Sequence, residues 1–312
     1  MLQSVELAEV QTQTRVDGMA LDASDPDRTD GPARATAGMQ TVELAGAAGP
    51  LVCDVWRARQ PAGKTPVVLV HGWGGSGMYW RETAEHLAAT VDVIVPDLPG
   101  SGRSMPVDRA QNLADLTQAL QQVLMALDVP RVQVVGHSMG AAVSILLADA
   151  APSRVERLAL VSMSFFTSWV QHQIYSTVMS AFSLGMIYRP QWLARVPYVP
   201  QMVAMRYFYR VPDDPALLRR GMLDFLTMDR ATAVTCANDA SSEAIPIAGA
   251  RLTVPTLLIA SRQDLVMPVS NVEYTVQTIP NCRVRWIEEC GHLPMVEKSQ
   301  EFLEILTEFL DL

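Results

Sequence analysis

The chain is poor in charged residues. They make up 18% of its 312 positions, against roughly 25% in an average soluble domain. The net charge is −9, and Lys and Arg do not gather into the kind of basic patch that follows a phosphate backbone. We therefore expect no nucleic-acid partner, and we attribute the acidity to a role in solubility.

Long apolar runs are also missing, although 49% of the residues are hydrophobic. The richest run, around Ala181 to Ile187, falls well short of the roughly 18 residues that span a bilayer. Residues 1–16 alternate polar and apolar side chains and lack the basic region and apolar block of a secretory signal. These absences predict a cytoplasmic protein with no stable membrane insertion.

Cysteine is scarce and scattered. The four cysteines form no Cys-x-x-Cys pair and have no His nearby at metal-ligand spacing: Cys53, Cys236, Cys282 and Cys290. Disulfides are rare in the cytoplasm. We therefore expect free thiols and no metal site.

Short apolar runs recur along the rest of the chain. We predict strands at Thr41–Leu44, Leu51–Trp56, Val67–Val70, Val91–Val95, Val132–Val135, Leu158–Val161, Thr256–Ile259 and Val284–Ile287. Several are continuous Val, Leu and Ile runs, as in strands that are covered on both faces of a parallel sheet. Helical periodicities lie between them, most clearly at Leu113–Leu127 behind the capping residue Asn112, and at Phe302–Leu310. This alternation predicts a doubly wound α/β fold.

Two stretches interrupt the alternation. Residues 1–38 include a segment rich in Gly, Pro, Asp, Ser and Thr, which predicts a flexible leader. Residues 163–245 are rich in aromatic residues and methionine and carry several prolines. We predict a helical cap there, inserted into a core formed by residues 39–162 and 246–312.

A first glycine motif follows the predicted strand Val67–Val70. Residues 72–77, with the sequence GWGGSG, match G-x-G-x-x-G, and Asp97 lies twenty positions beyond Gly77. On spacing alone this is a dinucleotide-binding fingerprint.

A second glycine motif, GHSMG at residues 136–140, stands between the predicted strand Val132–Val135 and an apolar helix over residues 141–150. Such a sharp strand-to-helix turn strains its central residue, and flanking glycines remove the side chains that would collide. The turn presents the hydroxyl of Ser138. The backbone N–H of Met139, at the start of the helix, faces the place where an oxyanion would form.

A serine hydroxyl needs a base, and the base needs an orienting acid. Asp264 follows the strand Thr256–Ile259, and His292 follows Val284–Ile287. Both positions are at strand ends, where open α/β sheets place their sites. Asp97 is the alternative acid.

From about Met39 onward the chain resembles the α/β-hydrolase family with a cap domain. Four motifs carry the resemblance: HGWG at 71–74, DLPGSGRS at 97–104, the GHSMG turn, and the segments around Asp264 and His292. The resemblance implies a mostly parallel eight-stranded sheet flanked by helices. It also implies Ser138 as nucleophile, Asp264 and His292 as acid and base, and an oxyanion hole formed by the N–H groups of Trp73 and Met139.

In similar proteins the Asp97 motif shapes a loop, and residues such as His71 and His137 hold loops by hydrogen bonds. The resemblance therefore implies that the GWGGSG turn is part of the serine site and does not bind a dinucleotide.

The resemblance also bears on the reaction. Dehalogenases and epoxide hydrolases of this fold depend on a carboxylate where this chain has Ser138. Carbon–carbon bond hydrolases tend to have Asn before the serine and Trp after the terminal His, and here those positions are His137 and Leu293. We therefore expect an esterase or lipase-like enzyme without a cofactor, acting on a small apolar ester with a medium-length acyl chain. Carbon–carbon hydrolysis, cofactor-free haloperoxidase activity and a non-catalytic receptor remain the alternatives, and the oligomeric state stays open.

Overall fold

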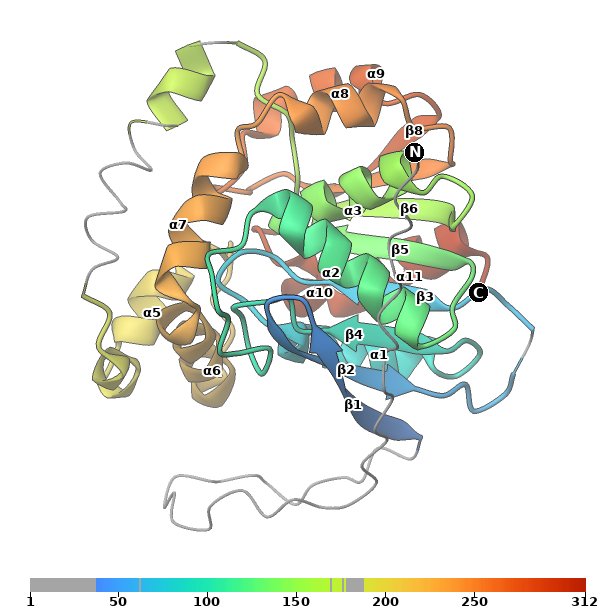
Figure 1. Ribbon diagram of the computed structural model, residues 1–312. Coiled ribbons are helices and arrows are strands. Elements are labelled where there is room, and N and C mark those ends of the chain that lie inside the picture. The colour runs from blue at the N-terminus through green and yellow to red at the C-terminus, as the bar shows by residue number, and fades with distance from the viewer. Residues whose placement is uncertain (1–37, 62, 169, 176, 178–187) are drawn as a thin grey trace, which may run out of the picture.

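The computed structural model describes residues 38–61, 63–168, 170–175, 177 and 188–312 (Figure 1). The predicted leader at residues 1–38 lies outside the described residues except for Gly38. The described chain folds around one sheet with helices on both faces (Figure 1).

The eight predicted apolar runs all become strands of this sheet. Its order is β1-β2-β4-β3-β5-β6-β7-β8. The strands are β1 (Met39–Gly46), β2 (Gly49–Trp56), β3 (Val67–Val70), β4 (Val93–Pro96), β5 (Val132–His137), β6 (Val155–Val161), β7 (Thr256–Ser261) and β8 (Cys282–Ile287). β2 runs antiparallel to β1 and to β4, whereas every other neighbouring pair is parallel. The predicted α/β-hydrolase fold is confirmed.

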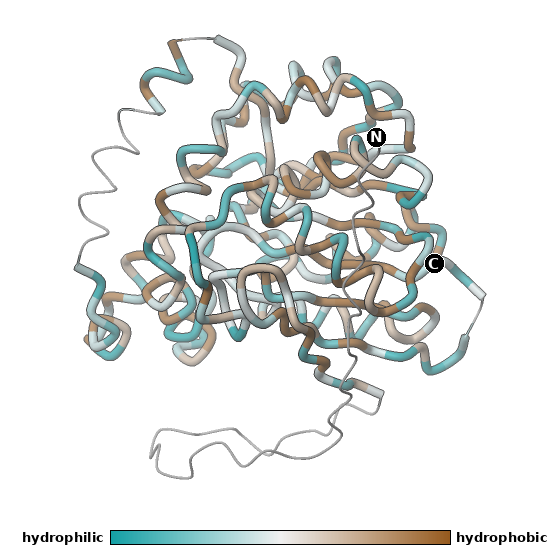
Figure 2. Tube along the Cα trace, viewed as in Figure 1, coloured by the Kyte–Doolittle hydropathy of each residue, from teal (hydrophilic) through white to brown (hydrophobic). Residues whose placement is uncertain are grey.

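The buried strands supply both halves of the core. Along β3, Val68 and Val70 pack with α2 (Leu113–Ala126) and α3 (Met139–Ala150). Val67 and Leu69 point the other way, toward α1 (Arg81–Leu87) and α11 (Ser299–Leu310). Alternate residues of a strand face opposite sides of the sheet, so a continuous apolar run is what two covered faces require. Figure 2 shows the contrast between the hydrophobic strands of the sheet and the hydrophilic loop that leaves β2.

Helix α2 begins where its capping residue predicts. The side chain of Asn112 accepts a hydrogen bond from the Asp115 N–H, and the Asp115 carboxylate accepts one from the Asn112 N–H. This reciprocal capping box satisfies two N–H groups that the helix itself leaves unpaired. Further helices complete the flanks: α8 (Ala244–Ala250), α9 (Val272–Thr278) and α10 (Pro294–Glu297), with 3-10 turns η1 (Gly77–Trp80) and η3 (Val269–Asn271).

The helical insert lies between β6 and β7. Its described elements include a helical stretch at residues 170–175, the 3-10 turn η2 (Gln191–Arg195) and the helices α5 (Val199–Ala204), α6 (Pro215–Thr227) and α7 (Arg230–Asp239). It contacts the loops that follow the parallel strands. The indole N–H of Trp73, after β3, donates to the Ala233 carbonyl at 2.9 Å, and the Asp229 N–H donates to the Gly100 carbonyl, after β4, at 2.7 Å. The insert therefore stands over the carboxyl ends of the sheet strands.

Candidate active site

The turn between β5 and α3 holds Ser138 in a strained backbone conformation, with φ 52° and ψ −116°. A Cβ at Gly136 would lie 2.4 Å from the Ser144 hydroxyl oxygen, and one at Gly140 would lie 2.4 Å from the Val70 carbonyl oxygen. Only glycine fits at either position. Ser138 is half-buried between two buried neighbours and lies directly after the carboxyl end of β5, the end of the strands over which the insert stands.

His292 and Asp264 meet in a buried pair. The His292 Nδ1 lies 2.8 Å from the Asp264 Oδ2, and their side chains are only 4% and 5% exposed. The other carboxylate oxygen accepts hydrogen bonds from the Val266 and Met267 N–H groups at 2.7 and 3.0 Å. Since a carboxylate only accepts, Nδ1 carries the proton and Nε2 is left as the basic nitrogen.

His292 also lies beside the serine turn. The rings of His137 and His292 are 4.8 Å apart between centroids. The three residues that the sequence nominates are Ser138, Asp264 and His292. They all lie beyond the carboxyl ends of their strands, which are β5, β7 and β8.

His137 has a defined place in this arrangement. Its Nε2 lies 2.9 Å from the backbone carbonyl oxygen of His292, which requires Nε2 to be the donor. Its Nδ1 therefore accepts from the Tyr79 hydroxyl at 2.9 Å, and that hydroxyl in turn accepts from the Gly72 N–H at 2.5 Å. Burial and the neighbouring His292 hold the pKa of His137 well below its usual value. His137 therefore stays neutral and links the glycine-rich loop to the His292 loop.

The candidate oxyanion donors lie on two adjoining loops. Met139 is the first residue of α3, and the first N–H groups of a helix have no partner within it. Gly140 packs against the carbonyl oxygens of Val70 and His71, so the loop after β3 lies directly on the start of α3. Trp73 is on that loop, and its indole ring packs edge-on against Phe225 of α6 at 5.5 Å. The use of the Trp73 and Met139 N–H groups for an oxyanion stays a prediction.

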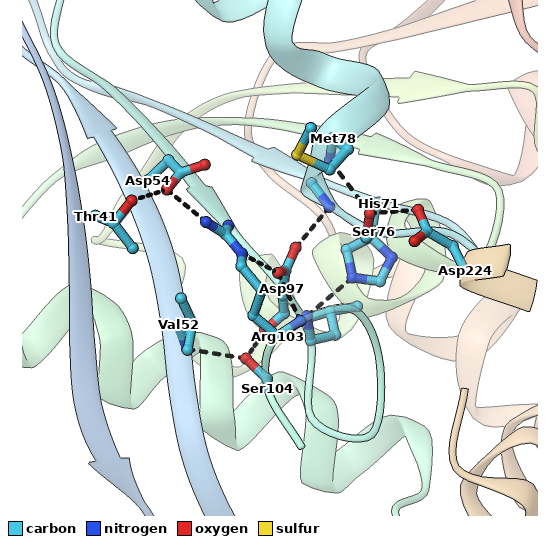
Figure 3. Close-up of polar contacts among 12 residues, drawn as sticks. Thr41, Val52, Asp54, His71, Ser76, Met78, Asp97, Arg103, Ser104 and Asp224 are labelled. Carbon is cyan, nitrogen blue, oxygen red and sulfur yellow. Dashed lines mark hydrogen bonds and ion pairs between the residues drawn. The ribbon is translucent and has the colours of Figure 1, made fainter. Parts of the chain in front are cut away.

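The Asp97 carboxylate is fully engaged elsewhere (Figure 3). One oxygen accepts from the Gly77 N–H at 2.7 Å, and the other accepts from the Arg103 N–H and Nε at 2.9 and 2.7 Å. Arg103 also reaches Asp54 at 2.8 Å. Burial alone would raise the pKa of Asp97, but the charge and hydrogen bonds of Arg103 together with the neighbouring His71 outweigh burial, and the pKa is lowered. This carboxylate closes the glycine loop, so it serves neither as the ribose-binding acid of a dinucleotide site nor as the acid of His292.

His71 fastens the same loop. Its Nε2 accepts from the Leu98 N–H at 2.9 Å, so Nδ1 donates to the Gly72 carbonyl at 2.9 Å. Burial lowers its pKa, and a neutral ring satisfies both contacts. The role of a loop-holding histidine, which the resemblance implies, fits this geometry.

The insert is tied to the glycine loop by a buried acid. Asp224 of α6 accepts from the Ser76 hydroxyl at 2.6 Å (Figure 3). It also accepts from the Arg220 Nε at 3.0 Å. Burial raises its pKa. Sequence reasoning missed this residue because Ser76 lies 148 positions away.

The insert is also tied to the loop of His292. The His292 N–H donates to the Tyr207 carbonyl at 2.6 Å. The Glu297 carboxylate, just downstream, accepts from the backbone N–H groups of Gly291, Tyr209 and Arg210 at 2.8, 3.2 and 2.5 Å. The segment Tyr207–Arg210 is thus fastened to the backbone that carries His292.

The remaining candidates take part in no such cluster. Cys53, Cys236, Cys282 and Cys290 are free thiols. Within the described ranges, no three His, Cys, Asp or Glu side chains come together as metal ligands would. In the same part of the chain, no helix has both the length and the apolar character for crossing a bilayer.

Comparison with known proteins agrees with this fold. Residues 65–299 match a family described as the alpha/beta hydrolase fold. The chain belongs to the alpha/beta hydrolase fold family. Two curated relatives and one solved structure show how this alpha/beta hydrolase compares with others.

The first relative is a protein of Pseudomonas putida named as the dihydrolipoyllysine-residue acetyltransferase component of an acetoin cleaving system. It is 29% identical over 80% of this chain, which spans 64% of that protein's length. The second, from Cupriavidus pinatubonensis, is named as a 2-hydroxy-6-oxononadienedioate/2-hydroxy-6-oxononatrienedioate hydrolase. It is 27% identical, covering 80% of this chain and 88% of that protein. An esterase from Exiguobacterium antarcticum shares the fold, with a TM-score of 0.74 at 18% identity over 88% of this chain and all of that one.

Proposed function

We propose that this alpha/beta hydrolase cleaves a carboxylic ester of an apolar substrate through an acyl-enzyme on Ser138. The observation that carries the proposal is the buried 2.8 Å contact between His292 Nδ1 and Asp264 Oδ2, set beside the strained serine turn. A pair fixed in this way leaves a basic Nε2 and stabilises the imidazolium that forms when a serine gives up its proton.

In the first half of the reaction, His292 Nε2 takes the proton of the Ser138 hydroxyl while Oγ attacks the ester carbonyl carbon. The N–H groups of Trp73 and Met139 receive the negative charge on the carbonyl oxygen. The C–O bond to the alcohol then breaks, and the alcohol leaves with the proton from His292. Removing one oxyanion donor in such sites costs on the order of 10²–10³ in rate.

In the second half, His292 takes a proton from a water molecule, and the resulting hydroxide attacks the acyl carbon. The bond to Ser138 Oγ breaks, the serine regains its proton from His292, and the carboxylic acid leaves. The two half-reactions use only groups of the chain itself, the ester and one water molecule.

We propose residues 163–245 as the cap that selects the substrate. Phe225, which packs on Trp73, and Tyr207, whose ring centre lies 6.2 Å from that of His292, bring aromatic surface to the site. Apolar walls favour acyl chains longer than acetyl, because each buried methylene contributes about 0.8 kcal/mol. His137 and Leu293, in place of Asn and Trp, favour ester cleavage over the carbon–carbon hydrolysis named for one relative.

A fluorophosphonate label mapped by peptide mass, followed by a panel of p-nitrophenyl esters of graded acyl length, tests the proposal. We expect the label on Ser138, and loss of both labelling and turnover in Ser138→Ala. The exposed Ser153→Ala serves as the control and should keep both. Highest turnover on acetyl esters would overturn the preference for medium chains. Labelling without turnover of any ester, or turnover only of dienoate ring-cleavage products, would overturn the esterase.

A further inference from the structure

The insert carries a concentration of exposed apolar side chains. More than half of the large apolar side chains that the structure describes as exposed fall within residues 188–209. Tyr198 is 76% exposed, Met202 69% and Trp192 56%. The group, which we call the apolar face, consists of Tyr188, Trp192, Tyr198, Met202, Val203, Met205 and Tyr209. Exposed large apolar side chains concentrated in one segment indicate a candidate interaction site.

The local fold leaves several large apolar residues of this segment exposed, while Leu193 and Val199 pack partly on the core of the insert. Helix α5 buries Pro200 and Ala204 and exposes Met202 and Val203. In η2, Ala194 is the buried residue, packed with the α6 side chains of the insert's core. Figure 1 shows α5 on the side of α6 that faces away from the sheet. An ordinary surface helix buries its large apolar residues, so the exposed Met202 and Val203 of α5 leave a surface suited to a partner.

The charge of this segment is opposite to that of the chain. Residues 188–212 contain four arginines and no Asp, Glu or Lys, whereas the whole chain has a net charge of −9. The side chains of Arg195 and Arg206 are exposed. Arg210 is also exposed and pairs with Glu289 at 2.9 Å. Aromatic and aliphatic side chains interleaved with arginine are characteristic of segments that lie at a membrane–water interface.

We propose that the apolar face docks on an anionic phospholipid surface. Trp192 and the tyrosines have the apolar ring and polar tip that suit the headgroup region. Arginines on the same segment are attracted to an anionic leaflet. A second copy of the chain is a poorer occupant, because a symmetric contact between two such faces brings arginine against arginine.

The docking surface adjoins the candidate active site. Tyr207, between Met205 and Tyr209 of the apolar face, accepts the His292 N–H through its carbonyl at 2.6 Å. A lipid surface held at this face is therefore next to the cap side of the site, where apolar esters dissolved in the bilayer become accessible. Docking itself goes beyond the proposed reaction and does not depend on it.

Co-sedimentation of the full chain with vesicles tests the proposal. We expect binding to vesicles of phosphatidylcholine with phosphatidylglycerol, weaker binding to phosphatidylcholine alone, and a loss of binding as salt is raised. The double variants Arg195→Glu/Arg206→Glu and Tyr198→Ser/Met202→Ser should each weaken binding to the anionic vesicles roughly tenfold or more. Met125→Ser/Arg283→Glu, which changes exposed residues of α2 and β8, is the matched control and should bind like the original chain.

A second measurement locates the contact. Brominated lipids should quench the fluorescence of Trp192, and Trp192→Phe should remove this quenching while leaving vesicle binding largely intact. Ser138→Ala should bind vesicles normally, so failure of the reaction and failure of docking are separable.

Three outcomes overturn the docking proposal. They are equal binding by the face variants and the control, no preference for anionic vesicles, and a dimer in analytical ultracentrifugation that the face variants dissociate.

Discussion

The His137 side chain donates a hydrogen bond to the backbone carbonyl of His292 across 2.9 Å. The residue immediately before the candidate nucleophile therefore holds the backbone of the candidate base. Because Tyr79 supports the other ring nitrogen of His137, the two loops and the glycine-rich turn form one hydrogen-bonded unit. Small displacements of His292 relative to Ser138 are resisted by this unit.

Replacing His137 should slow ester hydrolysis more than it weakens substrate binding. His137→Leu removes the donor to His292 and the acceptor for Tyr79, and a net loss of about 1 kcal/mol in positioning corresponds to a rate several-fold to tenfold lower. Steady-state kinetics should show the change in kcat, with KM altered less. His137→Gln, which restores an N–H near the Nε2 position, should recover part of the rate. An unchanged kcat in His137→Leu would remove the positioning role.

Loss of the Glu297 carboxylate should loosen the insert from the His292 loop. Glu297→Ala leaves three backbone N–H groups without this acceptor, and we expect a fall of about 1–3 kcal/mol in the free energy of unfolding. Limited digestion with trypsin should cut after Arg206 and Arg210 faster than in the original chain. Glu304→Ala, at an exposed position of α11, is the control. Equal digestion of both variants would contradict the fastening role of Glu297.

Asp97 should make the fold acid-sensitive. Its pKa is lowered in the folded chain from an unfolded value of 3.8, so its stabilising contribution is complete above pH 3.8 and is lost as the pH falls through the folded value. Asp97→Asn should lower the free energy of unfolding by about 3 kcal/mol at neutral pH. The gap in this free energy between the variant and the original chain should close in strong acid. Urea denaturation across this range measures it. The exposed Asp108→Asn should shift stability by less than about 0.5 kcal/mol at any pH. A gap that is independent of pH would refute the ionic role of Asp97.

The four thiols should be unreactive in the folded chain. Burial raises the pKa of Cys53, Cys236 and Cys290 to about 12 and that of Cys282 to about 11, and the thiolate is the reactive form. Alkylation by iodoacetamide at neutral pH should be slow until guanidinium is added, after which all four react. Cys282, the least buried, should react first, and Cys282→Ser should remove that phase. Rapid labelling of Cys53 in the folded chain would be the contrary result.

The strands and the serine turn were predictable because their signals are local. A run such as Val67–Val70 has to be covered on both sides. The glycines at 136 and 140 belong to one local motif, although the backbone that Gly140 approaches is that of Val70 and His71, after β3. The ends of the strands were predicted less accurately. Val91 was expected in a strand, but its N–H bonds the Leu87 carbonyl at the end of α1, and β4 begins at Val93.

The contacts that organise the site were not predictable, because they join distant positions. Tyr79 and His137 are 58 residues apart, and Tyr209 and Glu297 are 88 apart. No periodicity or spacing marks such a pair in a single sequence. The G-x-G-x-x-G match misled for a related reason. In a dinucleotide site the acid after the motif binds the ligand, whereas here Asp97 accepts hydrogen bonds from Gly77 and Arg103 of the chain itself.

The two ends of the insert leave and rejoin the sheet at neighbouring strands. β6 and β7 pair directly, from Leu158 with Thr256 to Val161 with Ile259, so the register of the sheet does not depend on what is inserted between them. The insert, which we propose as the substrate-selecting cap, is consequently a cassette whose replacement would leave the pairing of β6 with β7 unchanged. A functional graft has to bring its own equivalents of the Tyr207 carbonyl and the Asp224 carboxylate, because these two groups connect the cassette to the base loop and to the glycine loop.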